Sequence, residues 1–127
     1  MLNPSKITID FIDHERQRYD TCGDYILYPN GEIVIKVSKT GNADYNCLIA
    51  LHELIEVFLT QKRGISEESI AKFDIKFEKK RKKGNTDEPG DFGHYKREHR
   101  FAENMERLLA HELGVDWNKY SIKVTSL

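Results

Sequence analysis

Residues 48–59 read LIALHELIEVFL, nine apolar side chains interrupted by His52, Glu53 and Glu56. The apolar positions cover nearly the whole circumference of a helix, a pattern typical of a helix buried in a protein core. At about 100° per residue, Glu56 lies roughly 40° and Glu53 roughly 100° from His52, so the three ionisable groups share one broad face. An unpaired buried carboxylate costs several kcal/mol. These groups must therefore be paired, protonated or bound to a cation.

The segments before this helix predict strands. Residues 7–11 alternate Ile7, Ile9 and Phe11 with polar residues, the period of a half-buried strand. Two β-rich runs, YILY (25–28) and EIVIKV (32–37), flank an Asn-Gly pair, which is the strongest short-range hairpin signal. We expect the first strand and the hairpin to form a small antiparallel sheet.

Three helices are expected to pack on this sheet in a single α+β domain covering residues 1–127. The central helix begins near Asp44 or Asn46 and runs to about Arg63, before Gly64. Residues 65–77 predict a second, shorter helix, capped near Ser66. Residues 78–93 predict a long exposed loop, and residues 121–127 a short strand. The last helix runs from about Tyr95 to Leu113, with a core stripe formed by Phe101, Met105, Leu108 and Leu109.

Composition narrows the classes of function. The chain has 20 basic and 21 acidic side chains and a net charge of -1, which argues against a protein that coats nucleic acid as a whole. Only two cysteines occur, which favours free thiols in a reducing cytoplasm. The first residues lack the apolar stretch of a signal peptide, and the longest apolar segment is too short and too charged to span a bilayer. We therefore expect a cytoplasmic protein without a membrane partner.

Two helices carry histidine and glutamate one turn apart, which predicts a metal site. His52 and Glu56 are spaced i and i+4 on the central helix, and His99 and Glu103 repeat this spacing on the last one. We predict His52, Glu56 and His99 as ligands of a divalent metal, with Glu103 as a fourth ligand or a group behind the ligands. Zinc is the first choice, and carboxylate ligands also suit Mn, Fe or Mg.

Other residues near these helices have weaker or different roles. The loop before the last helix could cover the site with Glu88, Asp91 and His94, and Asp74 is a further candidate. His111 and Glu112 are expected at the surface. Without a metal, His52 and the glutamates would form a buried polar network, and His99 with Glu103 an exposed face that pairs with arginines.

The pentapeptide His52-Glu53-Leu54-Ile55-Glu56 resembles the metal-binding helix of the zincin metallopeptidases, with glutamate in place of the second histidine. In that superfamily a substrate-side edge strand precedes the helix, as EIVIKV precedes it here. The resemblance implies a zincin-like fold in which His52 is a metal ligand and Glu56 occupies the second ligand position. It also implies that Glu53 is the catalytic general base that activates a metal-bound water. Such water also hydrolyses phosphodiesters, so the substrate is left open between a peptide and a phosphodiester.

A wider resemblance covers roughly the C-terminal two-thirds of the chain. HELIE, EPGD and YKREHRFAENMERLLAHELGVDW are similar to segments of small proteins found in bacteriophage and prophage genomes. It implies a phage-encoded protein that works in the host cytoplasm.

Three alternatives stay open. Glu53/Glu56 and Glu103/Glu106 have the spacing with which MazG-like nucleotide pyrophosphohydrolases hold magnesium, although that all-α fold has no hairpin. A non-enzymatic phage protein that binds a host factor would use its polar helix faces only for folding. The KKRKK run at 79–83 would attract nucleic acid, but acidic residues follow it closely.

Overall fold

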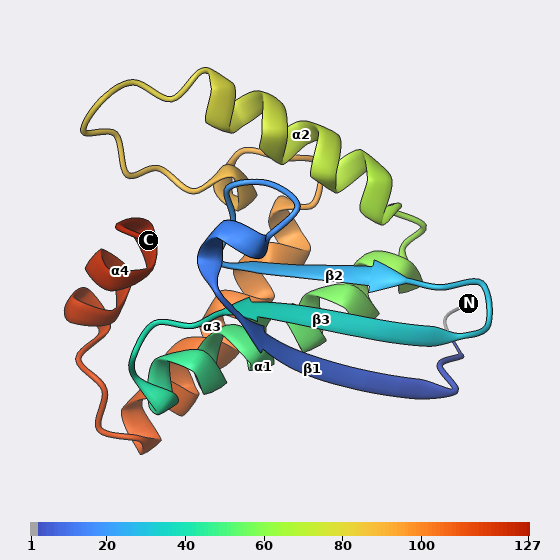
Figure 1. The fold of residues 1–127 in the computed structure, drawn as a ribbon, viewed down its shortest axis with the longest axis horizontal. Coiled ribbons are helices and arrows are strands. Elements are labelled where there is room, and N and C mark those ends of the chain that lie inside the picture. The colour runs from blue at the N-terminus through green and yellow to red at the C-terminus, as the bar shows by residue number, and fades with distance from the viewer. Residues whose placement is uncertain (1–2) are drawn as a thin grey trace.

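The structure, a computed structural model, describes residues 3–127. It has the expected α+β architecture, with a small sheet in front of α1 and α3 in the view of Figure 1. In chain order the elements are β1 (Lys6–Ile12), the 3-10 turn η1 (His14–Arg16), β2 (Gly23–Leu27), β3 (Glu32–Ser38), α1 (Ala43–Lys62), α2 (Glu67–Lys79), the 3-10 turn η2 (Pro89–Asp91), α3 (Lys96–Glu112) and α4 (Trp117–Thr125).

The sheet has the strand order β1-β3-β2 and is mixed. β2 and β3 form the expected antiparallel hairpin, and Gly31 takes a positive φ of 89° in its turn. β1 pairs with β3 in parallel, so the expectation of an antiparallel first strand is wrong. Alternating residues indicate a strand but not its direction. The direction is set by the path of the chain. Residues 13–22 cross at one end of the sheet from the β1 edge to the β2 edge, and the hairpin then brings β3 back parallel to β1.

The EIVIKV strand is central rather than an edge strand. β3 lies between the other two strands and buries Ile33, Ile35 and Val37 completely or nearly so. The strand that lines the cavity beside α1 and α3 is β2, through Gly23, Asp24 and Tyr25. The edge-strand position that the zincin resemblance implied for EIVIKV is therefore wrong.

The core forms where α1 packs on the sheet. Leu48, Ile49 and Val57 of α1 are at most 2% exposed and cluster with the apolar side chains of β3. The helix has the expected bounds, and its cap is Asn42, whose side chain accepts hydrogen bonds from the backbone N–H groups of Asp44 and Tyr45. It is not buried all round, because Phe58 is 40% exposed on the face turned away from the sheet.

The last helix buries a different face from the one that its sequence suggests. Phe101, Met105 and Leu108 are 52%, 37% and 63% exposed, so the predicted core stripe is wrong. The buried face of α3 consists of Glu98, His99, Ala102, Glu106 and Ala110. Small alanines let α3 approach α1 closely, and the ionisable groups between them find partners across that interface.

The ends of the other helices follow local capping. Ser66 caps α2 as expected by accepting from the N–H of Ser69, but α2 continues two residues into the segment expected as loop. Residues 121–127 do not form a strand. Asp116 accepts a hydrogen bond from the N–H of Lys119 and starts the helix α4, which buries Tyr120.

The composition predicts free thiols and no membrane-spanning segment. Cys22 and Cys47 are free thiols. Over residues 3–127, none of the helices is both long enough and apolar enough to cross a membrane.

Candidate metal centre

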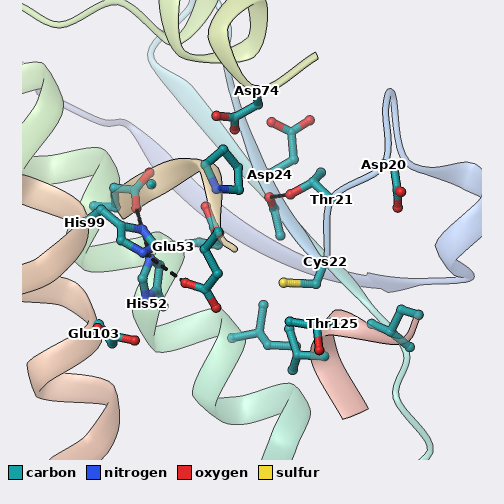
Figure 2. A pocket seen from close by; sticks show the side chains of 18 of the residues that line it. Asp20, Thr21, Cys22, Asp24, His52, Glu53, Asp74, His99, Glu103 and Thr125 are labelled. Carbon is teal, nitrogen blue, oxygen red and sulfur yellow. Dashed lines mark hydrogen bonds and ion pairs between the residues drawn. The ribbon is translucent and has the colours of Figure 1, made fainter. Parts of the chain in front are cut away.

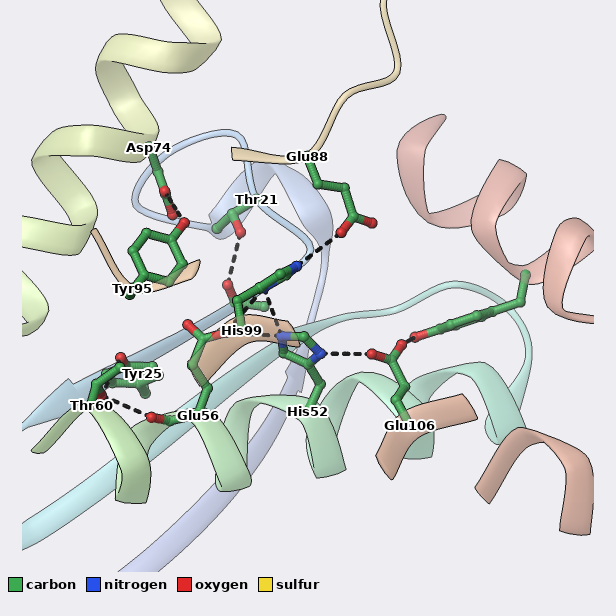
Figure 3. A network of polar contacts seen from close by, with 12 residues as sticks. Thr21, Tyr25, His52, Glu56, Thr60, Asp74, Glu88, Tyr95, His99 and Glu106 are labelled. Atoms are coloured by element: carbon green, nitrogen blue, oxygen red, sulfur yellow. Dashed lines mark hydrogen bonds and ion pairs between the residues drawn. The ribbon is translucent and has the colours of Figure 1, made fainter. Parts of the chain in front are cut away.

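Three side chains from two helices converge in the buried space between α1 and α3. The Oε2 atom of Glu56 lies 2.9 Å from Nε2 of His52 and 3.3 Å from Nδ1 of His99. The two ring nitrogens lie 3.2 Å apart (Figure 3). All three residues are at least nine-tenths buried. The structure thus brings together the three residues that the sequence singled out as ligands.

The size and chemistry of this triangle suit a divalent ion. Zinc binds imidazole nitrogen and carboxylate oxygen at about 2.0–2.2 Å, which places tetrahedral ligand atoms roughly 3.3–3.6 Å apart. The observed separations of 2.9–3.3 Å need to widen by only a few tenths of an ångström. No fourth His, Cys, Asp or Glu of the described chain joins this group. Three protein ligands and one open position are characteristic of catalytic rather than structural zinc sites.

Each histidine directs its second ring nitrogen to a carboxylate. Nδ1 of His52 lies 2.6 Å from Oε1 of Glu106, and the hydroxyl of Tyr120 donates a hydrogen bond to the other oxygen of that carboxylate. Nε2 of His99 lies 3.2 Å from Oε2 of Glu88. Carboxylates placed in this way behind a histidine fix the orientation of the ring and its tautomer in metal sites.

The partners behind the histidines were only partly visible in the sequence. The loop position of Glu88 suggested that it covers the site, and it does. The sequence suggests Glu106 only as a possible magnesium ligand, although it lies seven residues after His99 and hence on the same helix face. No local signal identifies Tyr120, which lies just before the segment 121–127 that predicts a strand.

In the absence of a metal, protons balance the charges of the cluster. Burial alone would lower the pKa of His52, but hydrogen bonds to Glu106 and Glu56 outweigh it and raise this pKa well above its usual value. The pKa of His99 also rises despite burial, to about 9, through Glu56 and Glu88. Burial opposes ionisation of Glu56, yet the two histidines lower its pKa to about 2. In the absence of a metal, the surrounding carboxylates therefore favour the protonated form of each ring, and a dication would replace ring protons.

Glu53 lies beside this cluster and faces a cavity of about 220 Å³ (Figure 2). Its side chain is 9% exposed, and its carboxylate forms no hydrogen bond within the described part of the chain. Burial and the charge of Glu56 raise its pKa well above the ordinary value. A carboxylate with a raised pKa and free lone pairs is suited to accept a proton from a ligand or a water in the cavity.

Two glycines hold the reactive side chains in place. A Cβ atom on Gly23 of β2 would lie 2.4 Å from Oε1 of Glu53. A Cβ atom on Gly90 in η2 would lie 2.3 Å from Nδ1 of His99. The backbone therefore packs directly on both groups, and any larger residue would displace them.

The remaining candidates do not join the three ligands. Glu103 is partly buried at the cavity and faces Arg107 at 3.8 Å, so the expectation of a fourth ligand has no support in the geometry. Asp91 forms a second group with Glu88 and His99, but it also pairs with Arg100 at 3.8 Å. His94 lies 2.9 Å from the hydroxyl of Ser69, away from the ligands.

The last two candidates are Asp74 and the His111-Glu112 pair. Asp74 lines the cavity and accepts hydrogen bonds from the hydroxyls of Tyr19 and Tyr95. Burial raises the pKa of Asp74 to about 7. His111 and Glu112 are exposed, as expected.

Comparison with protein-family models, curated proteins and solved structures finds no match to this chain. The donor set comprises two imidazoles, one carboxylate and an adjacent free carboxylate in a cavity.

Proposed function

We propose that this protein is a metal-dependent hydrolase with a zincin-like centre. In this proposal His52, Glu56 and His99 hold a divalent ion, and Glu53 is the general base. The observation that carries it is the convergence of three ligand atoms within 4.8 Å of one another, with a carboxylate behind each imidazole. A structural ion pair needs no open cavity beside it, whereas a hydrolytic centre does.

The ligand set favours zinc. Two imidazoles and one carboxylate are a known ligand set of hydrolytic zinc, although the same set also accepts iron or manganese. Magnesium is less suitable because it prefers oxygen ligands in near-ideal octahedral geometry.

The side chains divide the work of hydrolysis between them. A divalent ion in this position supplies a Lewis acid that makes water a good nucleophile near neutral pH. Glu53 takes the proton from the attacking water and returns it to the leaving group, because none of the described residues forms a hydrogen bond with its carboxylate. Glu106 and Glu88 keep the two imidazole rings turned toward the ion.

The magnesium pyrophosphohydrolase alternative loses support from the same contacts. Glu106 is engaged by His52 and Tyr120, and Glu103 faces Arg107, so they do not present a free carboxylate pair. The sheet is also foreign to that all-α fold. If the purified protein binds no metal, a non-enzymatic protein that binds a host factor becomes the favoured alternative.

Metal analysis of the purified protein tests the proposal. Protein prepared without chelator should carry close to one zinc, or another transition metal, per chain. His52→Ala and His99→Ala should lose it. His111→Ala is the matched control, because this exposed histidine lies on the same helix as His99. Glu53→Gln should retain the metal but abolish hydrolysis, measured on a mixed peptide library and on bis(4-nitrophenyl) phosphate.

Two outcomes would overturn these assignments. Wild-type protein that binds no metal would remove the centre altogether. Loss of metal from Glu53→Gln would show that Glu53 is a ligand rather than the base.

A further inference from the structure

Charge is unevenly distributed between the cavity and the rest of the chain. The whole sequence is nearly balanced, with 20 basic and 21 acidic residues. The charged residues that line the cavity are nevertheless almost all carboxylates, and the exceptions among described residues are three histidines and Arg81. No lysine lines it. A cavity with walls of one sign concentrates ligands of the opposite charge and repels those of the same charge.

The only arginine of the cavity is not available to a ligand. The guanidinium of Arg81 donates to both oxygens of Glu78 at 2.8 Å. Its remaining hydrogens go to the backbone carbonyls of Asn85 and Asp87, each at 2.6 Å. Arg81 therefore organises the loop after α2. The lysines beside it, at 79–80 and 82–83, lie outside the cavity.

Two cavity carboxylates, those of Asp74 and Glu53, form no ion pair with another described residue. Arg18 neutralises Asp24 through two hydrogen bonds of 2.7 and 3.0 Å. Asp74 instead receives only tyrosine hydroxyls, and Glu53 receives no hydrogen bond from the described residues. In Figure 2, Asp74 and Asp24 lie at one end of the cavity, Glu103 lies toward the other, and Glu53 lies between them. The buried, unpartnered carboxylate of Glu53 points to a ligand that brings hydrogen-bond donors.

A bound dication does not reverse this balance. Its two positive charges are offset by Glu56 and by the carboxylates behind the histidines, Glu88 and Glu106. The carboxylate of Asp74 remains in addition, whereas that of Glu103 is partly balanced by Arg107 at 3.8 Å. A phosphodiester would enter this space without any lysine or arginine to receive its charge, whereas phosphate recognition depends on such contacts.

We propose that the hydrolase takes a peptide that places a lysine or arginine side chain in this acidic cavity next to the bond to be cut, and that it excludes phosphodiesters. The proposal rests on the proposed function and names its substrate class. The cavity, about 220 Å³, is smaller than typical pockets of roughly 300–1,000 Å³, and fits one side chain with the adjacent peptide bond better than a whole small ligand.

Matched inhibitors test the charge preference separately from turnover. Two acetylated dipeptide hydroxamates, identical except for lysine or glutamate next to the hydroxamate, offer the metal the same chelating group. Their binding to the zinc-loaded full chain is measured by calorimetry at pH 8. We expect the lysine compound to bind at least tenfold more tightly, and the dinucleotide TpT at 1 mM not to displace it.

Two variants of α2 test whether the cavity carboxylates cause the preference for the lysine compound. Asp74→Asn removes a cavity carboxylate and should reduce the lysine preference at least threefold. Glu68→Gln is the control, because this side chain of α2 is 81% exposed and does not line the cavity. It should leave the preference unchanged.

The outcomes separate the two proposals. Absence of zinc from the wild-type protein overturns the proposed function. If zinc is bound but the glutamate compound binds as well as the lysine compound, or neither binds, the charge preference is wrong and the metal centre stands. Displacement by TpT would favour a phosphodiester substrate and also overturn the preference.

Discussion

Nδ1 of His52 lies 2.6 Å from Oε1 of Glu106, a residue 54 positions further along the chain. This contact joins α1 to α3 and leaves Nε2 of His52 facing Glu56 and His99. Since the other oxygen of Glu106 is held by the hydroxyl of Tyr120, three helices fix the orientation of a single imidazole ring. The site therefore depends on residues that would not themselves touch a metal.

Glu106→Gln should weaken zinc binding by about 10- to 100-fold, the usual effect of removing a carboxylate behind a ligating histidine. The amide can still accept the hydrogen bond from His52, but it has no charge to make the ring more basic. Competition with a chromophoric chelator measures the change. Tyr120→Phe should have a smaller effect because the contact between Glu106 and His52 remains. Wild-type affinity in Glu106→Gln would contradict the role given to this carboxylate.

Gly23→Ala and Gly90→Ala should separate catalysis from metal binding. Neither glycine has a positive φ, so the added methyl group acts only through its contacts. In Gly23→Ala the flexible end of Glu53 moves aside, and hydrolysis should fall at least tenfold while zinc is retained. In Gly90→Ala the packed ring of His99 must shift, and zinc binding should weaken, with a loss of stability of about 1–3 kcal/mol. Equal effects of both variants on metal content would refute this division.

Zinc binding at pH 7 should release about two protons. The pKa of His52 is raised above its usual value and that of His99 to about 9, so both rings are protonated in the metal-free protein. Both must lose a proton to bind the ion. The apparent affinity should therefore rise with pH up to about 9. Calorimetry in two buffers of different ionisation enthalpy counts the protons, and a count near zero would mean that the rings are already neutral.

Asp74→Asn should change how the stability of the metal-free protein depends on pH. The pKa of Asp74 is raised to about 7 in the folded protein, from roughly 4 in an unfolded chain. The folded state thus binds this proton more tightly, and wild-type stability falls as pH rises from about 4 to about 7. The variant lacks this loss and should be more stable than wild type at pH 8, by up to roughly 4 kcal/mol. Urea unfolding at pH 4 and pH 8 measures the difference, and parallel curves for the two proteins would argue against a shifted pKa.

Local patterns predicted most of the elements and the three converging side chains. The hairpin, α1 and the Ser66 cap follow from turn chemistry, apolar content and capping, which act over a few residues. His52 and Glu56 stand out because ionisable residues in a buried helix need partners, and His99 stands out because it repeats their spacing with Glu103 on another helix. Periodicity could not show that α3 buries its polar face, because the burial of Glu106 depends on partners from α1 and α4. The pairing of β1 with β3 and the contact of Glu106 with Tyr120 could not be predicted either, because both join segments that are distant in the sequence.

The connection between β1 and β2 has two roles, because residues 13–22 cross past β3 to the opposite edge of the sheet and also supply part of the cavity wall through Tyr19, Thr21 and Cys22. None of the three converging side chains comes from it. Insertions or deletions in this connection should therefore change the shape of the cavity, and hence which ligands fit it, without moving His52, Glu56 or His99.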